Sequence, residues 1–515
     1  MGSGFLDDGA GLNLVTFDGR AASDVNVLDD AHLACVVPDG VALTSGDVVL
    51  ANDNGQAALV QGFRWQRRLA TDLNNDGRGD LVLSSPGNDE VTTDAGAVHV
   101  FFGATLPLLD RTSAQAELTA LPEAAGTTFG SAIASGDLNG DGQSELIVGA
   151  PGDDRVARDA GAVFVFAGPL TAAPTALQPS AASLMLTGTQ LAERFGKSLA
   201  LHDLNNDGYL DLLVGAPGRG PGNVHVYLGT AGGLGATPDL TLPGEVSNED
   251  FAGSLAAGDL DGDGWSEIVV GAQNAFGELA LSPTGSSWHP GEVRVYQGGP
   301  TLFGPSAPAP WLVFSGDQDR ERFGSTLAAH DVSGDGIVDL LVGAPGRWER
   351  GNDSGAVFVF YGRSDLTGAR SGGASVKFTP EAPGDRLGDA LAAGDVDGDG
   401  LADILIGAPG YAGMGRAYLI LGSGQLATRS VALADSIFRA ESASGQFGAT
   451  VALVDVDGNG REEPVITAPA FSGELGRVYV FDGTNALGSH DAAISEGKLT
   501  GQVSGDRLGH ATTSD

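Results

Sequence analysis

The chain has 515 residues, which is too long for one compact core, so we expect several domains or a repeat architecture. Glycine accounts for 81 residues, yet 42% of the chain is hydrophobic, so the chain is rich in tight turns and can still bury a core. The formal net charge of −39 excludes nucleic acid as a default partner and favours cations.

The first part of the chain, residues 1–62, contains three strand-like pieces. They are residues 32–37, 47–52 and 56–62, with a turn at Asp53-Asn54-Gly55. The opening Met1-Gly2-Ser3-Gly4 is interpreted as added residues that replace a native leader. Cys35 is the only cysteine, so no disulfide can form within the chain, and we expect it to be an inert small hydrophobe. No run of 18 apolar residues occurs, so we expect no membrane span.

An aspartate-rich segment, "DLNNDGRGDL" from Asp72, recurs along the rest of the chain. The seven copies begin at Asp72, Asp137, Asp203, Asp259, Asp331, Asp395 and Asp455. Successive starts are 65, 66, 56, 72, 64 and 60 residues apart, about the length of a four-stranded unit with its loops. We call each copy an acidic loop, name it by its first aspartate and number its positions 1 to 9.

Each acidic loop has oxygen-bearing side chains at positions 1, 3, 5 and 9 and glycine at position 6. Alternate residues of a tight loop can point inward, position 7 can offer its backbone carbonyl, and calcium takes six to eight oxygen ligands. Magnesium would require fewer protein ligands and a stricter octahedron. The sequence therefore predicts up to seven Ca²⁺ sites, and the alternative is a set of solvated acidic turns. The predicted metal-binding positions are Asp72, Asn74, Asp76, Arg78, Asp80, Asp137, Asn139, Asp141, Gln143, Glu145, Asp203, Asn205, Asp207, Tyr209, Asp211, Asp259, Asp261, Asp263, Trp265, Glu267, Asp331, Ser333, Asp335, Ile337, Asp339, Asp395, Asp397, Asp399, Leu401, Asp403, Asp455, Asp457, Asn459, Arg461 and Glu463.

The first acidic loop contains the tripeptide Arg78-Gly79-Asp80, which resembles an adhesion ligand. Asp80 falls at position 9 and Arg78 at position 7, so the carboxylate that a receptor would need is assigned to the metal. The other six loops have no such tripeptide. We therefore interpret it as a coincidence of loop chemistry.

Apolar segments flank every acidic loop. Upstream lies a Phe-Gly segment, such as "FGSAIASGD" from Phe129, and downstream lies Gly-Ala-Pro, such as Gly149-Ala150-Pro151. A third segment alternates valine with other residues, as in "GAVFVFAG" from Gly161, and a shorter apolar piece supplies a fourth. Proline ends a strand because it cannot donate to the ladder. The pattern predicts an all-β fold with four strands per repeat.

These joint motifs resemble the FG-GAP repeats of integrin α-subunits. The resemblance covers residues 65 to about 501 and implies a seven-bladed β-propeller of four-stranded blades with calcium in the first hairpin of a blade. An acidic loop in every repeat resembles bacterial members of the family more than animal integrins. The departures are Trp65-Gln66 in place of Phe-Gly, Leu387, and Asn459 with Gly460 and Glu463 in the last loop.

The predicted domains are residues 1–62, an N-terminal segment with closing strands or a degenerate blade; 63–507, the propeller; and 508–515, the start of a closing strand. Because an open edge strand is a liability, the termini can instead pair into a degenerate eighth blade.

The sequence gives no catalytic constellation. His-Glu-x-x-His, Gly-x-Ser-x-Gly and a phosphate-cradling loop do not occur, and the paired carboxylates are explained as metal ligands, so we expect no enzyme. A binding module fits better, with contact candidates Trp288 and His289 in the 273–290 excursion and Trp348 and Arg350 in 346–355. In integrins the Phe-Gly aromatics line the mouth of the central channel and help to hold a partner subunit. By resemblance these would be Phe129, Phe195, Phe251, Phe323 and Phe447, and the alternative is packing of blade against blade.

The sequence thus predicts an extracellular, cell-surface or periplasmic calcium-binding propeller that serves as an adhesion or protein-interaction scaffold. The expected partner is a protein ligand or partner subunit on a propeller face. The alternative is a lectin or polysaccharide-active protein on the same scaffold.

Overall fold

The computed structural model of the chain divides into two compact units, Met1–Arg68 and Leu69–Asp515, which we describe separately. It describes residues 70–513 except 89–93, 104–115, 120–125, 171–178, 219, 276–288, 305, 484–486 and 502–504. In the N-terminal unit it describes the backbones of residues 14–17, 20–21, 23–29, 32–36, 45–52 and 55–64.

The N-terminal unit is built from strands. One sheet has the order β2-β1-β5-β6, and β3 pairs with β4. These strands are β1 (Leu14–Phe17), β2 (Arg20–Ala21), β3 (Ser23–Asp29), β4 (His32–Val36), β5 (Ser45–Asn52) and β6 (Gly55–Arg64). The three predicted strand segments correspond to β4, β5 and β6, and Asn52 pairs with Gly55 at the predicted turn. The side chain of Cys35 and residues 53–54 lie outside the described residues.

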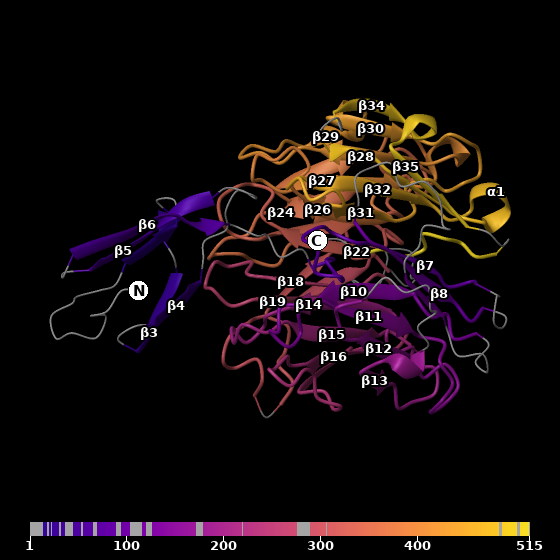
Figure 1. Ribbon diagram of the computed structural model, residues 1–515. Helices are drawn as coiled ribbons and strands as arrows, with labels where there is room; N and C mark the ends of the chain where they lie inside the picture. The colour runs from indigo at the N-terminus through magenta and orange to yellow at the C-terminus, as the bar shows by residue number, and fades with distance from the viewer. Residues whose placement is uncertain are drawn as a thin grey trace. The chain divides into compact units, whose positions relative to one another are not determined.

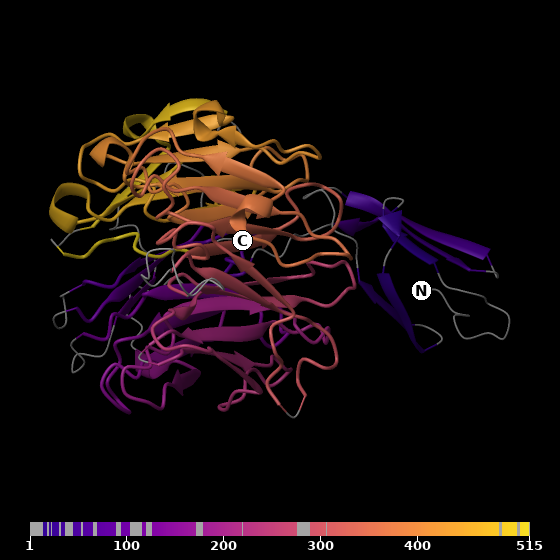
Figure 2. The same ribbon diagram turned by 180° about the vertical axis from the view of Figure 1, so that it is seen from behind.

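The second unit is an all-β propeller (Figure 1). Six sheets each contain four blade strands, which pair antiparallel with their neighbours. The blade strands are β10 (Ala132–Gly136), β11 (Glu145–Ala150), β12 (Ala162–Phe166) and β13 (Leu184–Thr187); β14 (Ser198–His202), β15 (Asp211–Ala216), β16 (Asn223–Tyr227) and β17 (Leu240–Pro243); β18 (Phe251–Gly258), β19 (Glu267–Ala272), β20 (Glu292–Tyr296) and β21 (Leu312–Ser315); β22 (Thr326–His330), β23 (Asp339–Gly343), β24 (Val357–Phe360) and β25 (Val376–Thr379); β26 (Ala390–Gly394), β27 (Asp403–Ala408), β28 (Arg416–Ile420) and β30 (Ser436–Arg439); β31 (Val451–Val454), β32 (Glu463–Ala468), β33 (Arg477–Val480) and β35 (Gly497–Thr500). Viewed from behind, the same sheets follow one another in chain order, from magenta to yellow (Figure 2).

The prediction of seven four-stranded blades, with eight as the alternative, is wrong, because the described residues form six blades. Among the described residues, the first repeat contributes a three-stranded sheet of β7 (Leu81–Ser85), β8 (Ala97–Phe101) and β9 (Ala116–Thr119). Its expected upstream segment, Trp65-Gln66, belongs to the N-terminal unit and lies outside the described residues. The C-terminal segment lies beside β7 instead, where Leu83 forms an antiparallel bridge with Thr512. An eighth blade closed by both termini is therefore wrong as well.

Two blades carry an extra strand at their outer edge. Strand β29 (Arg429–Ser430) pairs parallel with β25, and β34 (Gly488–Asp491) pairs parallel with β30. In the described residues, helical structure consists of short pieces such as α1 (Phe471–Glu474). None of the helices in the described part of the chain has the length and hydrophobicity needed to span a bilayer.

The hydrophobic core lies between successive sheets. The first strands β10, β14, β18, β22, β26 and β31 contact one another in turn around the centre, which explains their small residues. In one interface, Val98 and Val100 of β8 share a cluster with Leu146, Val148 and Phe164 of the next blade. Stacking of neighbouring sheets therefore buries both faces of each blade.

The Phe-Gly phenylalanines belong to these interfaces. Phe129, Phe195, Phe251, Phe323 and Phe447 are all at most 1% exposed, and Leu387 is 0% exposed at the equivalent place. Such side chains do not line an open channel mouth, so the implied partner-holding role is not supported. The alternative, packing of blade against blade, is confirmed.

Candidate metal centres

Each acidic loop of the six blades connects the first strand to the second, as predicted. Position 9 is the first residue of the second strand, for example Glu145 in β11 and Glu267 in β19. The position-6 glycines all have φ between 86° and 89°, in the left-handed region that glycine tolerates. The sharp bend expected from glycine at this position is therefore present in all seven loops.

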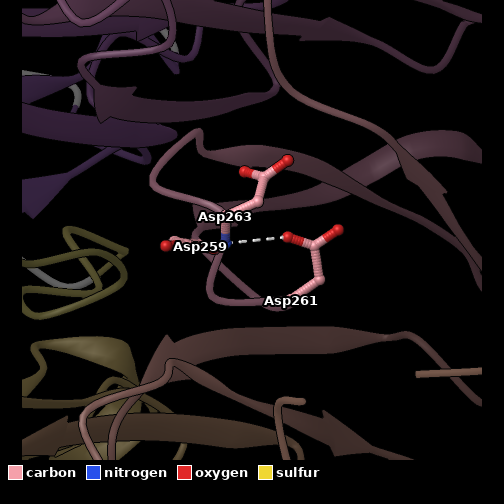
Figure 3. Close-up of side chains that lie close together, drawn as sticks. All are labelled: Asp259, Asp261 and Asp263. Atoms are coloured by element: carbon pink, nitrogen blue, oxygen red, sulfur yellow. Dashed lines mark hydrogen bonds between the residues drawn. The ribbon is translucent and has the colours of Figure 1, made fainter. Parts of the chain in front are cut away.

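The Asp259 loop shows how the chain folds upon itself (Figure 3). The carboxylate of Asp259 accepts hydrogen bonds from the amides of Asp263 (3.1 Å) and Gly264 (2.9 Å). Asp261 accepts from the amide of Asp263 at 3.1 Å, drawn as the dashed line in Figure 3. Asp263 accepts from the amide of Trp265 at 2.9 Å. Local amides thus hold the position-1, position-3 and position-5 carboxylates in place.

The same bonding recurs in the other loops. In every loop the position-1 carboxylate accepts from the position-6 amide, at distances of 2.8 to 3.0 Å. Three carboxylates converge in three loops, with ligand atoms within 4.8 Å of one another: Asp259, Asp261 and Asp263; Asp395, Asp397 and Asp399; Asp455, Asp457 and Glu463. In the other four loops position 3 is Asn or Ser, and among the described residues no group of three carboxylates is that close.

Position 9 differs from the other predicted ligands because it is buried behind the loop. Asp80 is 0% exposed, and its two oxygens accept hydrogen bonds from the amides of Leu73 (2.8 Å) and Gly103 (2.7 Å). Asp211 is bonded in the same way by Leu204 and Gly229, both at 2.8 Å. The position-9 carboxylate therefore ties the acidic loop to the end of the third strand.

Burial raises the pKa of the position-9 carboxyl groups, because a buried charge loses its hydration. The pKa of Asp80 is raised to about 8, and that of Glu463 to about 9, with nearby Asp457 and Asp455 adding to the shift. The pKa values of Glu267 and Asp403 are raised to about 7. A divalent cation beside these groups would replace the proton, since it stabilises the carboxylate form.

The donor set fits a hard cation. It consists of carboxylate and amide oxygens held close together, and in the metal-free loop these like charges repel one another. The position-7 side chains, such as Tyr209 and Ile337, lie over a neighbouring loop, which leaves only the backbone carbonyl of position 7 as a possible ligand. The structure thus brings the carboxylates of positions 1, 3 and 5 together in the Asp259 and Asp395 loops, and those of positions 1, 3 and 9 together in the Asp455 loop.

Sequence reasoning missed two parts of this scaffold. The first is the glycine that follows each third strand, whose amide donates to position 9. The sequence signal for it was the glycine in segments such as "VYLG", ending at Gly229.

The second missed part is an acidic residue two places before the Phe-Gly motif. Glu249, 1% exposed, accepts from the amides of Glu245 (2.9 Å) and Val246 (3.3 Å), and Glu193, Glu321 and Asp385 act alike.

The tripeptide Arg78-Gly79-Asp80 is not displayed for a receptor. Asp80 is fully buried, and a Cβ added at Gly79 would lie 2.8 Å from Cγ1 of Val454. Of the expected contact candidates, Trp348 is 56% exposed, whereas Trp288 lies outside the described residues.

The segments of the chain that match protein-family models coincide with repeats that form sheets in the structure. The FG-GAP repeat matches residues 69–101, 129–166, 323–360, 387–420 and 447–481, and the FG-GAP-like repeat matches residues 203–270. The chain therefore belongs to the FG-GAP repeat family, with an integrin-alpha-like β-propeller.

Two kinds of relative stand out. Phosphatidylinositol-glycan-specific phospholipase D of Homo sapiens is 31% identical over 399 residues, which cover 69% of this chain and 46% of that protein. Integrin alpha-IIb of Mus musculus is 42% identical over 158 residues, 28% of this chain and 15% of that protein. The chain thus spans less than half the length of these relatives.

The expectation that the chain is not an enzyme is overturned by the first of these matches. The phospholipase is an enzyme by name, and 69% of this chain aligns with it. The physical reason for the error is that a propeller without a catalytic motif can still be part of a longer enzyme. Among solved structures, a rhamnogalacturonan lyase covers 97% of this chain at 13% identity with a TM-score of 0.36, which is too low to support an argument.

Proposed function

We propose that the acidic loops bind Ca²⁺ and that the stiffened propeller serves as an adhesion or protein-interaction scaffold outside the cytoplasm. The observation that carries this proposal is the repeated loop, in which position 1 is fixed by the position-6 amide in all seven copies. Extracellular calcium is millimolar, and weak modular sites with dissociation constants on the order of 10⁻⁴ to 10⁻³ M fill in that range.

The similarity to integrin alpha-IIb supports a binding role for the propeller. Trp348, which is 56% exposed, is the described aromatic most available for a protein contact. Loops on a rigid ring can vary without unfolding it, so ligand choice would reside in these segments.

Calcium counting tests the metal proposal. Asp261→Ala removes one of three clustered carboxylates and should lower the bound calcium by about one ion per chain. The matched control is Asp491→Ala, an exposed aspartate outside the loops, which should leave the count unchanged. Equal counts for both variants would refute the assignment.

A second candidate function follows from the phospholipase match. The propeller would be the part of an enzyme that recognises phosphatidylinositol-glycan ligands, in keeping with the glycan-binding alternative. A glycan array probed with and without calcium separates the two. Selective binding to phosphatidylinositol glycans would favour the enzyme-associated role. Absence of glycan binding together with capture of a cell-surface protein would favour the scaffold.

A further inference from the structure

Neighbouring acidic loops are joined directly through their backbones. At four junctions the amide of position 8 in one loop donates to the carbonyl oxygen of position 1 in the preceding loop. The pairs are Val338 to Asp259 (3.1 Å), Ala402 to Asp331 (3.4 Å), Glu462 to Asp395 (3.0 Å) and Gly79 to Asp455 (2.8 Å). Each bond ends on the residue whose carboxylate is the first predicted ligand of the preceding loop.

Side chains join the loops as well. The position-7 side chain of one loop lies over the position-4 glycine of the loop before it. A Cβ added at Gly262 would meet Cδ1 of Ile337 at 3.1 Å, and one at Gly334 would meet Cδ2 of Leu401 at 2.7 Å. Position 4 is asparagine in two loops, and in one of these, the Asp203 loop, the side-chain amide of Asn206 donates to the carbonyl of Gly264 at 2.6 Å.

The peptide group between positions 7 and 8 therefore serves two loops at once. Its carbonyl is the predicted backbone ligand of its own loop, and its amide bonds the preceding loop. A cation on the carbonyl oxygen orients this peptide group and polarises its amide, which strengthens the bond to position 1 of the neighbour. The neighbour then loses less conformational entropy when its own ion binds.

We propose that Ca²⁺ binds cooperatively between adjacent acidic loops, with the 7–8 peptide group as the link. This inference rests on the proposed function, namely that the loops bind calcium. It adds a regulatory consequence: the propeller stiffens over a narrow range of calcium concentration rather than loop by loop.

Electrostatics alone predicts the opposite sign. Emptying one loop removes two positive charges, and deleting one carboxylate removes a single negative charge, so the neighbourhood becomes more negative and the next loop would hold its cation more tightly. Cooperativity through the backbone predicts that the next loop binds more weakly. The sign of the change therefore separates the two effects.

Trp265 provides a reporter for a single loop. It occupies position 7 of the Asp259 loop, so Tb³⁺ bound there would emit when this indole is excited. Asp335→Ala disables the following Asp331 loop, whose Val338 amide bonds Asp259. We expect the Tb³⁺ concentration at half signal to rise about fivefold or more, the usual lower range for coupled sites.

Three controls accompany this titration. Asp76→Ala disables the Asp72 loop, which bonds the Asp455 loop and not the Asp259 loop, so the signal from Trp265 should not shift. Trp265→Phe should abolish the signal and so verify its source. Ile337→Ala keeps every predicted ligand and removes the side-chain contacts over Gly262 and beside Gly362, so it should shift the titration in the same direction by a smaller factor.

The outcomes separate failure of calcium binding itself from failure of the cooperative link between loops. If the unaltered chain takes up neither Tb³⁺ nor Ca²⁺, the proposed function fails. If it takes up Ca²⁺ and Asp335→Ala leaves the titration unchanged or makes binding tighter, the loops bind independently and the cooperative link is refuted. If Asp335→Ala perturbs the fold, the test rests on Ile337→Ala. A shift of the Tb³⁺ titration by Ile337→Ala supports the link, provided that this variant and the parent melt at the same temperature without metal.

Discussion

The amide of Gly79 donates a 2.8 Å hydrogen bond to the carbonyl oxygen of Asp455. It joins the acidic loop of the first repeat to that of the last, although 376 residues separate them in the chain. The C-terminal segment strengthens the same junction, because the amide of Ser84 donates to the carbonyl of Ala511 at 3.1 Å and the amide of Gly509 donates to the carbonyl of Ser84 at 2.9 Å. The first and last repeats are therefore in direct contact.

Gly79→Ala should weaken this junction. The added Cβ would lie 2.8 Å from Cγ1 of Val454 and 3.0 Å from the carbonyl oxygen of Asp455. Overpacking of this kind costs about 1–3 kcal/mol of unfolding free energy, and urea unfolding measures it. The control is Gly235→Ala, where the nearest atom would be the carbonyl oxygen of Thr237 at 3.7 Å. Equal stability of the two variants would contradict the close contact.

Asp80→Ala should destabilise the protein even after chelator treatment. The buried amides of Leu73 and Gly103 would lose their acceptor, and each unsatisfied buried donor costs about 1–3 kcal/mol. Asp365→Ala, at a side chain that is 84% exposed, should change stability by less than about 0.5 kcal/mol. If Asp80→Ala and the parent unfold at the same denaturant concentration without calcium, the position-9 carboxylate does not stabilise the fold through its hydrogen bonds and acts only as a metal ligand.

Metal-free protein should lose stability as the pH rises from about 5 to about 8, the reverse of common acid denaturation. The pKa of Asp80 is raised to about 8 and those of Glu267 and Asp403 to about 7, so the folded chain retains protons that the unfolded chain releases. Their contribution is complete below about pH 4 and is lost as the pH passes the folded-state pKa values.

Urea unfolding of chelator-treated protein at several pH values checks this dependence. Saturating calcium should flatten it, because the cation replaces the proton beside each carboxylate. A metal-free protein that gains stability up to pH 8 would show that these carboxyl groups are ionised in the fold.

Arg294→Ala should be among the more damaging single changes in the blade of β18 to β21. Arg294, 4% exposed, donates to both oxygens of Glu249 at 3.0 and 2.9 Å, and Glu249 is 1% exposed. Removing one partner of a buried pair costs about 3–5 kcal/mol. Arg363→Ala breaks an exposed pair with Asp365 and should cost at most about 1 kcal/mol. Thermal unfolding compares the two, and similar losses would mean that the Arg294 pair is solvated.

Local features of the fold followed from the sequence. Repeat spacing located the acidic loops, and the period-two pattern located strands such as β12 and β16, because these signals arise within a few residues. The turn at position 6 was predictable because only glycine adopts its backbone angles without strain.

Long-range pairings did not follow from the sequence. The segment "DRLGHATTSD" does not indicate that Thr512 pairs with Leu83, since a strand pattern does not identify the strand with which it pairs. The predicted number of blades was wrong for this reason. The double role of Asp80 was hidden for the same reason, because Gly103 lies 23 residues away. The contacts between successive loops likewise depend on how neighbouring blades stack, not on the composition of any one loop.

The most direct test of the central claim is a thermal melt of chelator-treated protein before and after calcium is resupplied, with bound calcium counted in the same samples. A single site at one hundred times its dissociation constant adds about 2.7 kcal/mol, so several filled loops should raise the melting temperature by several degrees or more. If the acidic loops bind calcium, this rise should accompany the uptake of several ions per chain. An unchanged melting temperature with no calcium taken up would contradict it.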